Sequence, residues 1–280
     1  MINRREIFLS LAAGLLMSPV RGLGLSAPLD IVATTGMIAD LIQNVGGSAV
    51  DVSSIMGPGI DPHAYRHTRG DILTITKADA VFYHGLDLEV QMFDFFDQLS
   101  AKHKVLAITE GIDKSKLLAY EDYENAYDPH IWMDPIIWAE TIDTLVDTLR
   151  QIIPDKSDIL TANAKAYRDQ LNSLDLYSKE VLSSVPAESK ILVTAHDAFS
   201  YFGVAYGFEV AGVQGISTNS EAGLYRIREL VDLLVSRNVS AVFVESSVSD
   251  HNLRALIEGA AAKGHTVSLA GELFSDAMGP

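Results

Sequence analysis

We begin with the run KSDILTANAKAYRDQLNSLDLYSKEVLSSV, which spans Lys156 to Val185. It contains neither glycine nor proline and lies between Pro154 and Pro186. A continuous helix of this length would extend roughly 45 Å at about 1.5 Å per residue. That is too long for one small lobe, so the run predicts a helix that joins two lobes. Its apolar side chains recur at about helical spacing, at Ile159, Ala162, Ala166, Leu171, Leu174, Tyr177, Val181 and Leu182.

Strand-like and helix-like segments alternate on both sides of this run, which predicts parallel, doubly wound sheets. The expected fold class is α/β, with two doubly wound lobes joined by one long backbone helix and a ligand cleft between them. We expect an N-terminal lobe over 28–153, the linking helix over 154–186 and a C-terminal lobe over 187–280. Strands are predicted at 29–34, 50–55, 80–83, 105–108, 190–194, 208–213, 241–244 and 266–269. Helices are predicted at 37–45, 71–78, 88–99, 198–206, 221–237 and 252–263.

The composition is that of a globular protein with a sizeable core, since 48% of the 280 residues are hydrophobic and 21% are charged. The chain has no cysteine. This excludes disulfides, cysteine-ligated zinc, iron–sulfur clusters, thiol nucleophiles and a lipobox cysteine. The formal charge of −16 is opposite to what a nucleic-acid partner requires, and its field attracts cations.

The N-terminus has the order of a secretory signal peptide, which we place at 1–27. Arg4 and Arg5 precede an apolar stretch from Ile7 to Met17, and small residues follow. That stretch reaches roughly 16 Å, about half the hydrocarbon core of a bilayer. The sequence therefore predicts an exported, periplasmic protein, with the arginine pair leaving the twin-arginine route open.

Among the 8 histidines, His63, His130 and His196 stand out because each lies at a turn between predicted elements. The tripeptide Asp-Pro-His occurs twice, ending at His63 and at His130. Proline fixes its own φ and biases the preceding residue toward extended backbone, which can help to hold an imidazole. No HExxH or HxH spacing is present, so taken singly each of these histidines favours a structural role over a ligating one. Surface or capping roles are expected for His103, His251 and His265, and a structural role for His84.

Read together, several segments resemble one known family. It is the metal-binding solute-binding proteins of zinc and manganese ABC transporters, called cluster A-I or cluster 9, which includes the TroA-like proteins. The resemblance covers about residue 29 to the end. The segments that carry it are GIDPHAY (59–65), ADAVFYHGLDLE (78–89), DPHIWMDP (128–135), TAHDAFSYF (194–202), GIST (215–218), VFVESS (242–247) and FSDA (274–277).

The resemblance implies the family fold of two α/β lobes bridged by a rigid helix, with a metal site in the cleft between the lobes. It also implies the metal ligands, which correspond to His63, His130, His196 and Asp276. Glu245 resembles a family residue that lies beside the site rather than ligating.

Three departures from the family pattern bear on these expectations. The sequence ends four residues after Asp276, where relatives continue into a helix, so we expect either that the fourth ligand lies near a frayed end or that the C-terminal lobe is truncated. His67 stands where relatives have a proline, and it could be an accessory metal contact or a surface residue. The segment 112–128 contains no histidine-rich run, which weakens a pure zinc assignment.

Three imidazoles and one carboxylate suit Zn²⁺, and a carboxylate that chelates through both oxygens would admit Mn²⁺; Fe²⁺ is a third option. The expected function is capture of such an ion as cargo and its delivery to an inner-membrane ABC permease. We expect a monomer that is not an enzyme and binds no nucleic acid. The alternatives are an exported metallohydrolase, for which no GxSxG or HExxH motif is present, and a metal-buffering or adhesive surface protein.

Overall fold

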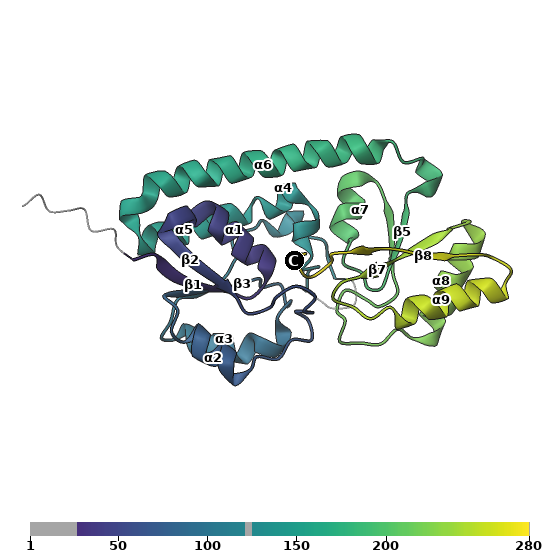
Figure 1. Ribbon diagram of the computed structural model, residues 1–280, viewed down its shortest axis with the longest axis horizontal. Helices are drawn as coiled ribbons and strands as arrows, with labels where there is room; N and C mark the ends of the chain where they lie inside the picture. The colour runs from purple at the N-terminus through teal and green to yellow at the C-terminus, as the bar shows by residue number, and fades with distance from the viewer. Residues whose placement is uncertain (1–26, 121–124, 280) are drawn as a thin grey trace, which may run out of the picture.

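The computed structural model describes residues 27–120 and 125–279 (Figure 1). Two four-stranded sheets lie side by side, and the long helix α6 (Ser157–Ser183) runs across both of them. The predicted signal peptide lies outside the described residues except for Ala27, and so does Pro280.

Both sheets are parallel and have the same relative strand order, β2-β1-β3-β4 in the first and β6-β5-β7-β8 in the second. The chain winds in one direction and then in the other, so the switch points lie between β1 and β3 and between β5 and β7. The predicted α/β class with two doubly wound lobes is confirmed. The strands are β1 (Leu29–Ala33), β2 (Val50–Ser54), β3 (Ala80–Tyr83), β4 (Val105–Ala107), β5 (Ile191–Thr194), β6 (Glu209–Gly212), β7 (Ala241–Glu245) and β8 (Ser268–Leu273).

Helices connect the strands and cover the sheets (Figure 1). Besides α6 they are α1 (Gly36–Gly46), α2 (Arg69–Ile75), α3 (Phe93–Ser100), α4 (Pro135–Trp138), α5 (Thr141–Ile152), α7 (Ser200–Tyr206), α8 (Leu224–Ser236) and α9 (His251–Ala262). Single 3-10 turns are η1 (Gly47–Ala49), η2 (Val90–Met92), η3 (Lys114–Lys116), η4 (Ile131–Met133), η5 (Pro154–Lys156) and η6 (Ala187–Ser189).

Helix α6 has 27 residues and, at about 1.5 Å per residue, a length of roughly 40 Å. The sequence predicted its existence but not the face that it buries. The buried stripe is Leu160, Tyr167, Leu171 and Asp175, whose spacing of seven, four and four residues follows one side of a helix. Of the predicted apolar face, only Leu171 is buried, while Ile159, Leu174, Tyr177 and Val181 are exposed. The helix contacts the lobes only along this narrow stripe, and apolar side chains also lie on its exposed sides. The distribution of apolar residues therefore did not identify the contact face.

Other element predictions were incomplete. Helices α4 and α5 were not predicted, although Ile142, Leu145 and Leu149 recur on one face of α5 and are fully buried. Helix α3 begins at Phe93 and not at 88, because Glu89 has non-helical backbone, with φ of −93° and ψ of 47°, and the 3-10 turn η2 follows it. Leu224, placed on the apolar face of α8, is 79% exposed at the helix start.

Each sheet has its own apolar core, and Tyr201 of the second lobe reaches into the core of the first. Ile31, Phe82 and Ile142 belong to the main core of the first lobe, and Val193, Val242 and Leu256 to that of the second. Tyr201 on α7, which follows the second lobe's first strand, is packed in the first lobe's core. No helix among the described residues has the length and hydrophobicity needed to cross a bilayer.

Candidate metal centre

Four side chains from distant parts of the chain meet between the lobes. One donor atom from each of His63, His130, His196 and Asp276 lies within 4.8 Å of the other three. Asp276 Oδ1 is 3.3 Å from His130 Nε2, and Oδ2 is 3.1 Å from His196 Nε2. The Nε2 atoms of His63 and His130 are 3.2 Å apart. All four residues are at most 2% exposed.

Each lobe supplies two of these residues, and each residue lies on a loop that follows a strand or leads into a helix. His63 lies between β2 and α2, and His130 immediately precedes η4. His196 follows β5, and Asp276 follows β8, where the chain returns to the space between the lobes (Figure 1). Gly212 permits the turn at His196, because a Cβ there would lie 2.4 Å from the Asp197 backbone nitrogen.

The repeated Asp-Pro-His tripeptide has a common backbone role. Asp61 Oδ1 accepts the backbone N–H of His63, and Asp128 Oδ1 accepts that of His130, both at 2.9 Å. In each case the aspartate bonds the residue two positions later, which is the Asx-turn arrangement. The tripeptide is therefore a turn that fixes the backbone of a histidine.

Two of the imidazoles are also held at their outer nitrogen. His130 Nδ1 lies 2.6 Å from Asp128 Oδ1, and His196 Nδ1 lies 2.5 Å from Glu245 Oε2. Glu245 Oε1 also accepts the backbone N–H of His196 at 2.9 Å. When Nδ1–H donates to the carboxylate, the lone pair of Nε2 is directed at the centre of the cluster. Glu245 thus lies beside the site, as the resemblance implied. The sequence did not indicate that Asp128 would hold His130.

The charges of the site are arranged for a cation. Burial lowers the pKa of His63 to about 3, so its imidazole is neutral. Burial also lowers the pKa of His130, but Asp128 and Asp276 outweigh it and raise the pKa to about 9. The pKa of His196 is raised well above its usual value, because Asp276 and Glu245 outweigh the effect of burial. Protons on these two histidines compensate the buried carboxylates, and a bound cation would replace them.

Several donor atoms of the cluster are buried without a hydrogen-bond partner among the described residues. They are His196 Nε2 and both carboxylate oxygens of Asp276. Buried polar atoms of this kind are uncommon in proteins and call for an explanation such as an ion. Three imidazole nitrogens and one or two carboxylate oxygens form a donor set that suits Zn²⁺, Mn²⁺ or Fe²⁺.

Asp276 is held firmly rather than lying on a frayed end. It is 1% exposed, and the backbone oxygen of the preceding Ser275 accepts a hydrogen bond from Trp132 Nε1 at 2.7 Å. Trp132 belongs to η4, directly after His130. The same turn therefore carries one donor and anchors the backbone beside another.

The remaining histidines lie outside the cluster. His67 stacks on Phe95 with ring centroids 4.7 Å apart and is not a member of the four-residue cluster. His84 is fully buried, edge-on to Trp132 at 5.0 Å, and burial lowers its pKa to about 3. His265 Nε2 bonds the backbone oxygen of Val239 at 2.7 Å.

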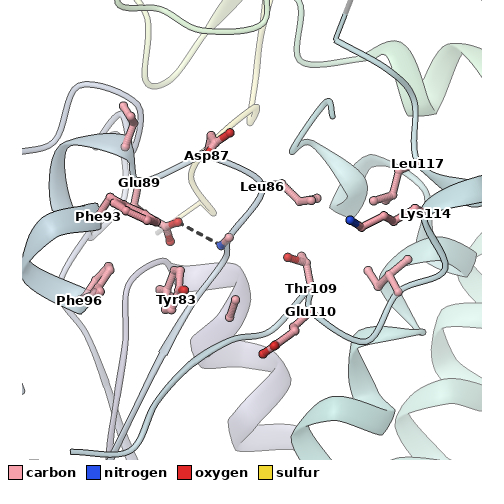
Figure 2. Close-up of a pocket in the computed structure, with 14 residues that line it drawn as sticks. Tyr83, Leu86, Asp87, Glu89, Phe93, Phe96, Thr109, Glu110, Lys114 and Leu117 are labelled. Carbon is pink, nitrogen blue, oxygen red and sulfur yellow. Dashed lines mark hydrogen bonds between the residues drawn. The ribbon is translucent and has the colours of Figure 1, made fainter. Parts of the chain in front are cut away.

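Glu89 is a buried residue that the sequence did not single out. It accepts hydrogen bonds from Thr34 Oγ1 at 2.6 Å and from the backbone N–H of His84 at 2.8 Å, at the ends of β1 and β3. It also accepts from the N–H of Gly85 at 3.3 Å, and Figure 2 shows its carboxylate directed at the backbone of this turn. Glu89 braces the first lobe's switch point, much as Glu245 holds the start of the turn after β5. The cavity of about 350 Å³ in Figure 2 is lined by none of the four clustered residues.

The fold and the cluster define a class of protein. Two lobes joined by one long helix enclose a buried group of four donors, contributed equally by both lobes. Four such donors can close a tetrahedral site, and a closed site binds an ion rather than activating a water molecule. The molecule is a two-lobed binding protein for a small cation.

Comparison with known proteins identifies the family. A family model described as the zinc-uptake complex component A, periplasmic, matches residues 31–280. The chain belongs to this family, and the resemblance inferred from its motifs is confirmed.

Individual relatives are similar to this protein over most of its length. The manganese-binding lipoprotein MntA of Bacillus subtilis is 44% identical over 251 residues, covering 90% of this chain and 82% of MntA. The zinc-binding protein TroA of Treponema pallidum is 43% identical, covering 89% of this chain and 80% of TroA. A solved structure of the periplasmic zinc-binding protein TroA from Treponema pallidum superposes with a TM-score of 0.87, covering 90% of this chain and 91% of that one. These are names of binding proteins, so the prediction of a non-enzyme is confirmed and the metallohydrolase alternative has no support.

Proposed function

We propose that this protein is the extracytoplasmic binding component of an ABC importer, and that it captures a divalent transition metal as cargo. The observation that carries the proposal is the convergence of four buried donors within 4.8 Å. Family membership and relatives named for zinc and manganese binding support it. The proposed ligands are His63, His130, His196 and Asp276. In this proposal Asp128 and Glu245 contact Nδ1 of two of the imidazoles and orient them, so that Nε2 of each binds the metal.

The donor set favours zinc and also admits manganese. Nitrogen-rich sites bind Zn²⁺ more tightly than Mn²⁺ in the general order of divalent affinities. Neither oxygen of Asp276 has a hydrogen-bond partner within 27–120 and 125–279, so this carboxylate can chelate with both oxygens and raise the coordination number. Manganese accepts that higher number more readily than tetrahedral zinc does. We therefore propose zinc as the tighter-bound cargo and manganese as the competitor, with Fe²⁺ as a third candidate.

The finer assignments complete the proposal. The protein acts as a periplasmic monomer and hands its ion to an inner-membrane permease. Its lobes are residues 28–153 and 187–280, linked by 154–186, and residues 1–27 are the export signal. Several relatives are named lipoproteins, whereas the present sequence contains no cysteine for the lipobox.

Metal content measured by mass spectrometry tests the assignment. The wild-type protein is expected to bind one Zn²⁺ per chain and to exchange it in competition with Mn²⁺. His130→Ala should lose this stoichiometric binding, because it removes a donor from the buried cluster. His251→Ala, an exposed histidine on α9, is the matched control and should retain it. Unchanged metal content in His130→Ala would contradict the proposed ligand set.

A further inference from the structure

A cavity of about 470 Å³ lies between the lobes and leads to the metal centre. His63 is the one member of the cluster that lines it. Leu86 and Tyr127 line it from the first lobe, and Ile216 and Asn219 line it from the second. Because the other three donor residues do not contribute to its wall, an ion that passes through this cavity meets His63 first.

The loop between β6 and α8 spans this cavity and bonds the opposite lobe at two points. Thr218 Oγ1 donates to Asp61 Oδ2 at 2.6 Å. Asn219 Nδ2 donates to the backbone oxygen of His63 at 2.9 Å. The partners are 157 and 156 residues apart in sequence, so both bonds depend on how the two lobes meet.

These two contacts act on the same short segment. Asp61 accepts the backbone N–H of His63 with Oδ1 while it accepts Thr218 with Oδ2. On the other side of His63, Asn219 Nδ2 donates a hydrogen bond to its carbonyl oxygen. The backbone of His63 is thus fixed at both its N–H and its C=O, and one of these two contacts comes entirely from the second lobe.

A second set of contacts between the lobes is buried more deeply. The Tyr201 hydroxyl donates to the backbone oxygen of Asp128 and accepts the N–H of Leu118, both at 3.0 Å, and Tyr201 is 1% exposed. Asn219 is exposed and Thr218 is half-buried. Water can replace the Thr218 and Asn219 bonds more easily than the Tyr201 bonds, so opening is expected at this loop while the Tyr201 side stays closed.

We propose that Thr218 and Asn219 are positioning residues that latch the second lobe onto the His63 turn and thereby set the rate at which the metal is released. The inference rests on the proposed function, since it concerns the same cargo. When the latch opens, the His63 backbone loses its contact with the second lobe while the other donors keep their supports. A partner that displaces the 215–223 loop would then release the ion without separating the Tyr201 contacts.

The experiment measures Zn²⁺ dissociation by mixing the loaded protein with excess chelator and following tryptophan fluorescence. The two tryptophans of the chain are Trp132 and Trp138, and the Trp132 ring centroid lies 5.2 Å from that of His130. Thr218→Val with Asn219→Ala should raise the dissociation rate about tenfold, since each hydrogen bond contributes about a two- to tenfold factor. The association rate should change less than about threefold, and the melting temperature of the metal-free protein should be nearly unchanged.

Two control variants separate a latch from a general disturbance of the loop. Ser220→Ala alters the same loop and the same cavity wall but removes no described bond between the lobes, and it should dissociate like the wild type. Thr218→Ser keeps the hydroxyl and should restore slow dissociation at that position. An unchanged rate in the double variant, or an equal rise in Ser220→Ala, would overturn the latch. If the wild-type protein binds no Zn²⁺, the proposed function fails and the latch fails with it.

Discussion

At the scale of single residues, the metal centre depends on carboxylates that do not face the metal. Asp128 and Glu245 each contact Nδ1 of a histidine. Through Nδ1 they determine the orientation and the basicity of the Nε2 atom that faces the metal. Removing the negative charge makes the imidazole a weaker base and loosens its orientation. Partners of this kind typically change metal affinity by about 10- to 100-fold.

We therefore expect Glu245→Gln to weaken Zn²⁺ binding by about 10- to 100-fold while leaving one ion per chain at saturation. Asp128→Asn should behave alike. Competition titration against a chelator of known affinity measures the change. Asp250→Asn, at an exposed pair with Arg254 on α9, is the charge-matched control and should bind as the wild type does. Loss of stoichiometric binding in Glu245→Gln would instead identify Glu245 as a ligand.

The pH dependence follows from the raised pKa values of His130 and His196. A metal needs both imidazoles neutral, so binding must release their protons. With the pKa of His130 raised to about 9, the affinity for Zn²⁺ should rise between about pH 6.5 and 9, by about one log unit per pH unit for each proton released. Calorimetry in buffers of different ionisation enthalpy measures the protons directly. An enthalpy that does not depend on the buffer would contradict this expectation.

The stability of the metal-free protein should change in the opposite direction. A histidine whose pKa is raised on folding adds stability that is complete below its unfolded pKa of about 6.5. That contribution is lost as pH rises through the folded value of about 9 for His130. The melting temperature without metal should therefore fall over this interval, and Asp128→Asn should flatten the fall. A metal-free melting temperature that rises from pH 6.5 to 9 would refute the assignment.

At the scale of elements, α6 is fixed to the lobes by a narrow set of side chains. Leu171 is 8% exposed and belongs to the first lobe's core, whereas Leu176 is 67% exposed on the same helix. Both are leucines in mid-helix, so they share the same helix propensity and differ in burial.

This pair gives a matched test of the contact face. Leu171→Ala should lower the free energy of unfolding by about 2–4 kcal/mol, because it removes buried methyl groups and leaves a cavity. Leu176→Ala should change it by less than about 0.5 kcal/mol. Denaturant unfolding of the metal-free protein measures both. Equal losses would mean that the buried stripe of α6 is wrongly assigned.

At the scale of the whole molecule, the metal ties the two lobes together. Each lobe supplies two donors, so a bound ion adds a connection to those already made by α6 and Tyr201. Neither lobe can unfold without releasing the ion. Stabilisation by the ion is therefore expected to act on both lobes.

Free Zn²⁺ at 100 times its dissociation constant should add about 2.7 kcal/mol to the free energy of unfolding. Hydrogen exchange should show protection in β1 and in β5 alike, since the binding energy is shared across the interface. His196→Ala, which removes one donor of the second lobe, should lose the effect in both sheets. Protection confined to one lobe would show that the ion does not couple them.

Much of the fold was predictable because its signals are local. The absence of glycine and proline from 156–185 indicated a continuous helix, and the alternation of segments indicated parallel sheets. The four clustered residues were recognised through motifs that surround them, not through any spacing of their own. Helix α5 was not predicted, although the helical spacing of its apolar residues is present in the sequence.

The sequence by itself determined the α/β class, the two lobes, the long helix and the family. Only the tertiary structure decided which side of α6 is buried, that Asp276 is firmly held, and which carboxylate supports which histidine. His196 and Glu245 are 49 residues apart, and Asp61 and Thr218 are 157 apart. The physical reason is that such pairs form where strand ends and lobes meet, and no local pattern in the chain encodes which groups will meet there.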